Sequence, residues 1–193
     1  MKLTKTLIML SFVLTCQLTK AQFKLPINNA FRNDVQKVVE AYPHQFAAIR
    51  GEVVVKNPQS VEYASLLKPN GAQESVIMQY SSAHKPVYTW QAVMLTTENF
   101  EAAAKKYKWL YGQLKGLNVK YVADMYTLRG AYETPEESRK FTTSVLTLQA
   151  PPTPLQKLKV EVSMQFEFPE WKVSMTIFEK EREDEEHGNI YEE

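Results

Sequence analysis

The stretch Leu158–Phe168, LKVEVSMQFEF, alternates apolar and polar side chains over its whole length. Successive side chains of a strand point to opposite faces of its sheet, so this pattern places all the apolar residues on one face. Those residues are Leu158, Val160, Val162, Met164, Phe166 and Phe168. Strict alternation is typical of an antiparallel sheet with one buried face and one wet face. The stretch therefore predicts such a sheet as the basis of the fold.

Other segments have the same strand character and are separated by turn residues, among them KNPQS, KPNG and SAHKP. Runs of β-branched and aromatic residues bounded by Pro, Gly, Asn and Ser are typical of strands joined by turns. With 157–168 included, the expected strands are about 47–56, 60–68, 74–82, 86–95, 118–129, 139–149, 157–168 and 171–180.

Two segments have the helical period of apolar residues. The first follows Asn28-Asn29, which can cap a helix, and it ends before Pro43. The second is expected to begin at Thr97 and to stop at Gly116. Its apolar stripe consists of Phe100, Ala103, Ala104, Tyr107, Leu110, Tyr111 and Leu114. Each helix is thus expected to bury one face.

The order of these elements is a helix and four strands, twice. We expect an α+β fold in which two helices pack on one face of an antiparallel sheet. An internal duplication of an α-β-β-β-β unit over 28–95 and 97–180 is one interpretation, and MQY at 78–80 echoes MQF at 164–166. Shared helical spacing by chance is the alternative. The arrangement is similar in outline to TATA-binding-protein-like and type III secretion chaperone folds, a similarity of topology that carries no function.

The first residues are typical of an export signal. Lys2 and Lys5 precede an apolar run from Leu7 to Leu14, which is too short to cross a bilayer. Cleavage after Ala21 would remove residues 1–21, including the only cysteine, Cys16. The alternative is a lipid anchor at Cys16, because VLTC resembles the lipobox of bacterial lipoproteins, although Thr15 replaces the usual small residue. We expect a periplasmic or secreted protein.

The remaining chain, with 22–180 as a single α+β domain, has a length that fits one core. The 23 basic residues less the three in the leader leave 20, against 22 acidic residues. This balance lacks the dense basic face of a nucleic-acid-binding protein. No apolar segment after the leader is long enough to span a membrane. Residues 181–193 are expected to form an acidic, disordered tail.

The sequence has few groups typical of catalysis. The three histidines, His44, His84 and His187, fall in no metal-binding spacing, and no nucleophile elbow or phosphate loop is present. We therefore assign no catalytic residue, metal ligand or cofactor. Asp124, in an apolar run, could be a base of raised pKa or could face water on its strand. A site built from His84, Glu74 or Asp124 is the basis of the enzyme alternative.

Aromatic residues provide the stronger indication. Tyr88, Trp90 and Met94 share one face of their expected strand, and Tyr80 lies on the strand before it. Large rings with polar tips are common in binding surfaces, while filling of the core is the alternative. We therefore expect ligand or partner contacts at Tyr80, Tyr88, Trp90 and Met94. On this hypothesis Trp90→Ala abolishes binding and leaves the fold intact.

These observations favour an exported, non-enzymatic binding module that engages a protein partner or an apolar small ligand through an aromatic sheet face. An envelope hydrolase or isomerase is one alternative. A structural envelope protein that associates with itself through an exposed strand edge is the other. The oligomeric state is left open by the sequence.

Overall fold

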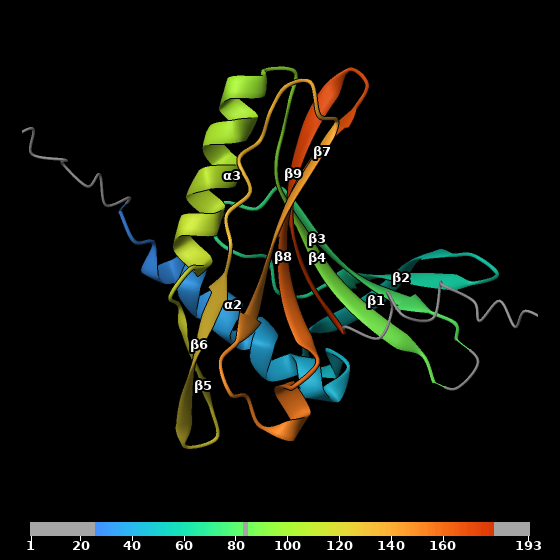
Figure 1. Cartoon of the computed structure of the whole chain (residues 1–193). Coiled ribbons are helices and arrows are strands. Elements are labelled where there is room, and N and C mark those ends of the chain that lie inside the picture. The colour runs from blue at the N-terminus through green and yellow to red at the C-terminus, as the bar shows by residue number, and fades with distance from the viewer. Residues whose placement is uncertain (1–25, 83–84, 180–193) are drawn as a thin grey trace, which may run out of the picture.

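The computed structural model describes residues 26–82 and 85–179. Nine antiparallel strands form one sheet in the order β1-β2-β3-β4-β9-β8-β7-β6-β5, with two α-helices on one side (Figure 1). The strands are β1 Arg50–Lys56, β2 Ser60–Ser65, β3 Glu74–Tyr80, β4 Val87–Thr97, β5 Asn118–Tyr121, β6 Asp124–Gly130, β7 Phe141–Leu148, β8 Leu158–Glu167 and β9 Glu170–Glu179. The expected antiparallel α+β character is confirmed, and strand predominates over helix.

Strand β8 confirms the alternation for most of its length. Leu158, Val160, Val162 and Met164 are buried, while the residues between them are more exposed. Phe168 was expected on the same buried face, and that expectation is wrong because β8 ends at Glu167. Phe168 lies instead in the two-residue turn before β9 and is 89% exposed. A side chain in a turn no longer follows the pleat of the strand.

The single strand expected over 118–129 is two strands, β5 and β6, so the sheet has nine strands rather than eight. A tight turn at Val122 and Ala123 separates them, and Tyr121 pairs directly with Asp124. Val122 has a positive φ of 57°, which is uncommon for a β-branched residue. The apolar run therefore concealed a turn, and Asp124 lies exposed at the start of β6.

Both helices begin at asparagine caps. Helix α2, Asn29–Ala41, starts where the Asn28 side chain accepts a hydrogen bond from the Phe31 amide at 3.1 Å. Helix α3, Phe100–Leu114, starts where the Asn99 side chain accepts from the Ala102 amide at 2.8 Å. The expected cap at Thr97 is therefore wrong, since Asn99 lies three residues before the donor, the spacing that a cap requires.

The helices close one face of the sheet over a shared core. Helix α3 packs on β4, β8 and β9, and α2 contacts β5 (Figure 1). The core joins apolar residues of α2 and α3 to the facing side of the strands. No helix among the described residues is long and apolar enough to span a membrane. Residues 1–21, which are expected to be a leader and include Cys16, and the expected acidic tail 181–193 lie outside the described residues.

Two glutamine side chains attach α2 to the rest of the molecule. Buried Gln113 on α3 donates to the Pro26 carbonyl and accepts from the Asn28 amide, both at 2.8 Å. Gln36 on α2 pairs with the backbone of Lys120 in β5, donating to its carbonyl at 2.6 Å and accepting from its amide at 2.8 Å. These contacts fix the start of α2 and cover the outer edge of β5.

Replacing Trp90 by alanine should destabilise the fold. The side chain is fully buried beneath the helices, and its ring N–H donates to the Ser65 hydroxyl at 3.0 Å. Truncating a buried tryptophan leaves a cavity and costs about 3–5 kcal/mol. Urea denaturation of Trp90→Ala should show that loss, whereas Tyr80→Ala, on the opposite face, should change stability far less. A loss below about 1 kcal/mol for Trp90→Ala would contradict the core assignment.

Replacing Tyr107 by phenylalanine should reduce the loss of stability at high pH. Burial raises the pKa of Tyr107 from 10.0 to about 12, although its 2.7 Å hydrogen bond with Ser144 opposes the rise. Between these values the unfolded chain loses the proton and the folded chain retains it, so stability falls as pH rises. Thermal unfolding from pH 8 to about 12 should show a shallower decline for Tyr107→Phe than for wild type. Parallel declines would refute this assignment.

Candidate binding site

The structure separates the four residues expected to bind. Trp90 and Met94 lie in the core under the helices, away from any open surface. Tyr88 lines a hollow at the end of the helical layer. Tyr80 lines a second hollow, on the face of the sheet that the helices leave open. The single aromatic sheet face expected from the sequence is therefore not present as one surface.

The first hollow, which we call the tyrosine–proline hollow, has a volume of about 270 Å³. It lies where the chain after α2, the start of β4, the turn before β8 and the end of β9 meet. Its lining includes six residues with rings, although most of the surface that it presents is polar: Tyr42, Pro43, Phe46, Pro86, Tyr88 and Pro154. Rings on a concave wall offer a rigid surface for the apolar body of a ligand.

The first wall of this hollow depends on how the chain leaves α2. Pro43 lies in a short 3-10 helix, Tyr42–His44, and cannot continue the α-helix. Gln45 and Phe46 then take positive φ angles of 54° and 58°, which turn the chain back on itself. The Phe46 amide donates to the Ala41 carbonyl at 2.9 Å, and the rings of Phe46 and Tyr42 lie 6.0 Å apart. The aromatic wall is therefore held by local backbone geometry.

The ring of Tyr88 is held in place by Arg50. The Arg50 guanidinium lies 5.1 Å from the ring centre of Tyr88 and 5.1 Å from that of Tyr63 on β2. A guanidinium over an aromatic face is attracted by the negative charge of the ring face. Arg50 thus links β1, β2 and β4 and restricts the ring that lines the hollow.

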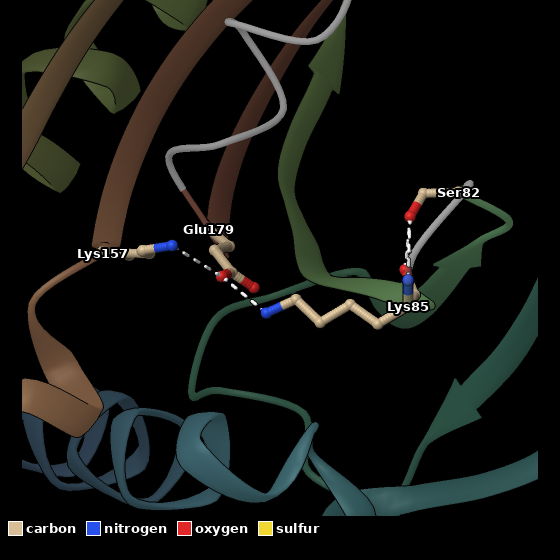
Figure 2. Close-up of polar contacts among 4 residues, drawn as sticks. All are labelled: Ser82, Lys85, Lys157 and Glu179. Atoms are coloured by element: carbon tan, nitrogen blue, oxygen red, sulfur yellow. Dashed lines mark hydrogen bonds and ion pairs between the residues drawn. The ribbon is translucent and has the colours of Figure 1, made fainter.

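A charged group lies beside these rings. The Glu179 carboxylate accepts a hydrogen bond from the Lys85 ammonium at 3.0 Å and lies 3.9 Å from the Lys157 ammonium (Figure 2). The side chains of Lys85 and Lys157 approach the carboxylate from different sides (Figure 2). The Ser82 hydroxyl donates to the Lys85 carbonyl and accepts from the Lys85 amide (Figure 2).

Tyr42 lies close to this charged group. Burial raises the pKa of its hydroxyl well above the usual value, and the negative charge of Glu179 raises the pKa further. The hydroxyl therefore stays protonated at neutral pH and keeps a hydrogen to donate. The hollow thus combines apolar rings with a hydroxyl, two ammonium groups and a carboxylate.

The second hollow lies on the open face of β2, β3, β4 and β9 and has a volume of about 290 Å³. Its lining residues are Glu62, Glu74, Val76, Met78, Tyr80, Gln91, Val93 and Lys172. Thr89 is buried on the same face, and its hydroxyl has no hydrogen-bond partner among the described residues. The lining is mixed in character, and no ring other than Tyr80 contributes to it.

Glu74 and Asp124, two of the three residues of the enzyme alternative, are not brought together. Glu74 lies on β3 and Asp124 on β6, with β4, β9, β8 and β7 between them in the sheet. His84 lies outside the described residues. Within 26–82 and 85–179, no group of three or more His, Cys, Asp or Glu side chains could hold a metal ion.

Comparisons with protein families, with curated proteins and with solved structures give no match. The site is therefore interpreted from its own geometry.

Sequence reasoning missed Glu179 and Lys157. Glu179 is the first residue of an acidic run and falls at the end of the strand expected over 171–180, where nothing in the sequence indicates a site; it is the last residue of β9. Lys157 directly precedes β8 after three prolines, and its position offers no periodic signal. The one indication in the sequence is that the acidic run begins where the last expected strand ends.

Replacing Glu179 by glutamine should lower the pKa of Tyr42. The change removes the negative charge that disfavours the tyrosinate, while burial of the ring persists. The Tyr42 ring carbon that bears the hydroxyl can be followed by ¹³C NMR through an alkaline titration. Glu179→Gln should titrate at lower pH than wild type, and Glu170→Gln, at the other end of β9, should not. An unchanged Tyr42 titration would show that Glu179 does not act on this hydroxyl.

Proposed function

We propose that this protein is a binding module whose ligand site is the tyrosine–proline hollow. The observation that supports this most is the convergence of tyrosine, phenylalanine and proline rings around the Lys85–Glu179–Lys157 group. Ligand sites commonly pair an apolar wall with a few polar groups that fix orientation. A concave wall favours a small ligand over a flat protein partner.

The chemistry of the hollow defines the ligand. Its volume of about 270 Å³ suits a compact molecule, smaller than a typical drug. Gln45, Thr153 and the charged group provide hydrogen-bonding partners, and the rings provide stacking surfaces. The ligand is therefore expected to be amphipathic, with one planar or apolar side and one polar side, rather than purely apolar.

The proposal includes export and the absence of catalysis. The charged and apolar pattern of residues 1–21 supports a leader that is removed after Ala21, which would place the module in the periplasm or outside the cell. The separation of Glu74 from Asp124 in the sheet supports binding rather than a reaction carried out by those groups.

An internal duplication is part of the same proposal. The sheet order is consistent with two units, α2 with β1–β4 and α3 with β6–β9, that meet at β4 and β9. MQY lies on β3 and MQF lies on β8, which occupy equivalent places beside the central pair. The β5–β6 hairpin makes the second unit longer by one strand. The hollow would then lie at an end of the joint between the two units.

The ligand site can be tested by NMR with simple probes. Phenol, benzoate, benzylamine and methyl glucoside each present a different part of the expected chemistry to ¹⁵N-labelled protein in its processed form. At least one probe should shift amides of residues 42–46, 85–88 and 153–157 in a saturable way. A Kd of about 1 mM corresponds to about 4 kcal/mol, which is within reach of such small molecules.

Matched variants distinguish the hollow from other surfaces. Thr153→Trp places a large ring at the rim of the hollow and should abolish the shifts. Thr134→Trp makes the same change in an exposed loop and should leave them intact. Failure of all four probes at about 10 mM, or shifts that survive Thr153→Trp, would refute the hollow as the ligand site.

A further inference from the structure

Four buried side chains lie on the face of the sheet that the helices leave open. Thr89, Val93, Ser174 and Phe178 are 5%, 5%, 3% and 8% exposed, and neither Val93 nor Phe178 belongs to the core beneath the helices. Both α-helices lie on the other side of the sheet (Figure 1). An antiparallel sheet with one covered face commonly leaves its second face in water. A phenylalanine buried on the second face therefore indicates that something lies over it.

The second hollow begins beside these side chains. Val93 lines it, and so does Met78, which pairs with Thr89 across β3 and β4. The Thr89 hydroxyl is buried without a hydrogen-bond partner among the described residues. Buried polar groups nearly always have a partner. An occupant that suits this face thus combines apolar side chains with hydrogen-bonding groups, as a peptide segment does.

We propose that the end of this same chain, residues 180–193, folds back over the open face and places Ile190 and Tyr191 against the second hollow. The segment follows β9 directly, immediately after Phe178 and Glu179. Ile190 and Tyr191 are the only hydrophobic residues in it. Gly188-Asn189 comes just before them, and that pair is typical of a turn.

The chain is long enough for this contact. Met78 on β3 lies two strands from Phe178 on β9, with β4 between them. Neighbouring strands are about 4.8 Å apart, so the crossing is about 10 Å. Ile190 comes eleven positions after Glu179, and an extended chain of that length spans up to about 36 Å. The surplus leaves room for the turn that the segment needs.

Apolar contact, rather than charge, is the basis of this docking. Two carboxylates, Glu62 and Glu74, line the hollow, and Lys172 is the one cation there. Residues 183–186 are all acidic. Like charges repel one another, and salt screens that repulsion between exposed groups. The docked segment should therefore survive high salt. The inference concerns the opposite face from the tyrosine–proline hollow and is independent of its ligand.

A spin label tests the contact in the processed chain. Cys16 lies in the expected leader, so Asn189→Cys supplies the one thiol of residues 22–193. A label on that thiol should broaden the amide signals of 76–80 and 89–93, relative to a diamagnetic label at the same position. Amides of β5 and β6, at the far end of the sheet, should stay sharp. The broadening should persist at high salt.

Matched variants identify the two sides of the contact. Replacing both Ile190 and Tyr191 by serine should remove most of the broadening at 76–80. Replacing both Glu192 and Glu193 by serine should preserve it. On the sheet, Met78→Glu places a charge in the hollow and should also release the segment. Met125→Glu makes the same change at an exposed position on β6 and should have no effect.

The remaining outcomes overturn the proposal. Labelled ¹⁴N protein mixed with unlabelled ¹⁵N protein should give no broadening, because the contact lies within one chain. Broadening in that mixture would assign the open face to a second copy instead. Absence of broadening at 76–80 in the labelled chain, its loss at high salt, or its persistence without Ile190 and Tyr191 would each refute the docking. Dispersed amide spectra of the variants show that the fold is retained.

Discussion

The antiparallel pairing of β4 with β9 is the interaction on which the rest of the structure depends. It joins residues more than 70 positions apart, from Trp90 opposite Ile177 to Thr97 opposite Trp171, and so closes the chain on itself. Bringing together residues so far apart in the chain costs conformational entropy. Burial of Trp90, Ala92, Met175 and Ile177 beneath α3 offsets this cost through the hydrophobic effect. Without that pairing the two groups of strands would be separate sheets.

The candidate site is a consequence of the same pairing. It brings the start of β4 beside the end of β9, so Lys85 and Glu179 meet although 94 positions separate them. The turn before β8 then adds Lys157, and the chain that leaves α2 adds Tyr42 and Phe46. A charged group of this kind is stabilised because each charge has a partner nearby. The ring wall and the charged group therefore come from parts of the chain that share no local sequence signal.

The two edges of the sheet show how one architecture can protect one side and leave the other open. At β5 a glutamine side chain substitutes for a neighbouring strand, because an amide presents a donor and an acceptor together. At β1 the valines and the charges that flank them stay accessible.

The sequence by itself determined both helices and most of the strands, because periods of two and 3.6 residues are local properties that follow from backbone geometry. It also placed Trp90 and Met94 on one face of their strand, but it could not show that the helices cover that face. Residues 118–129 appeared as one strand because a turn without glycine or proline carries no local signal. Only the tertiary structure decided that Tyr80 and Tyr88 lie on opposite faces of the sheet, and that Glu179 lies between Lys85 and Lys157. Contacts between distant residues depend on how strands pair and layers stack, and that is a property of the whole chain rather than of any segment.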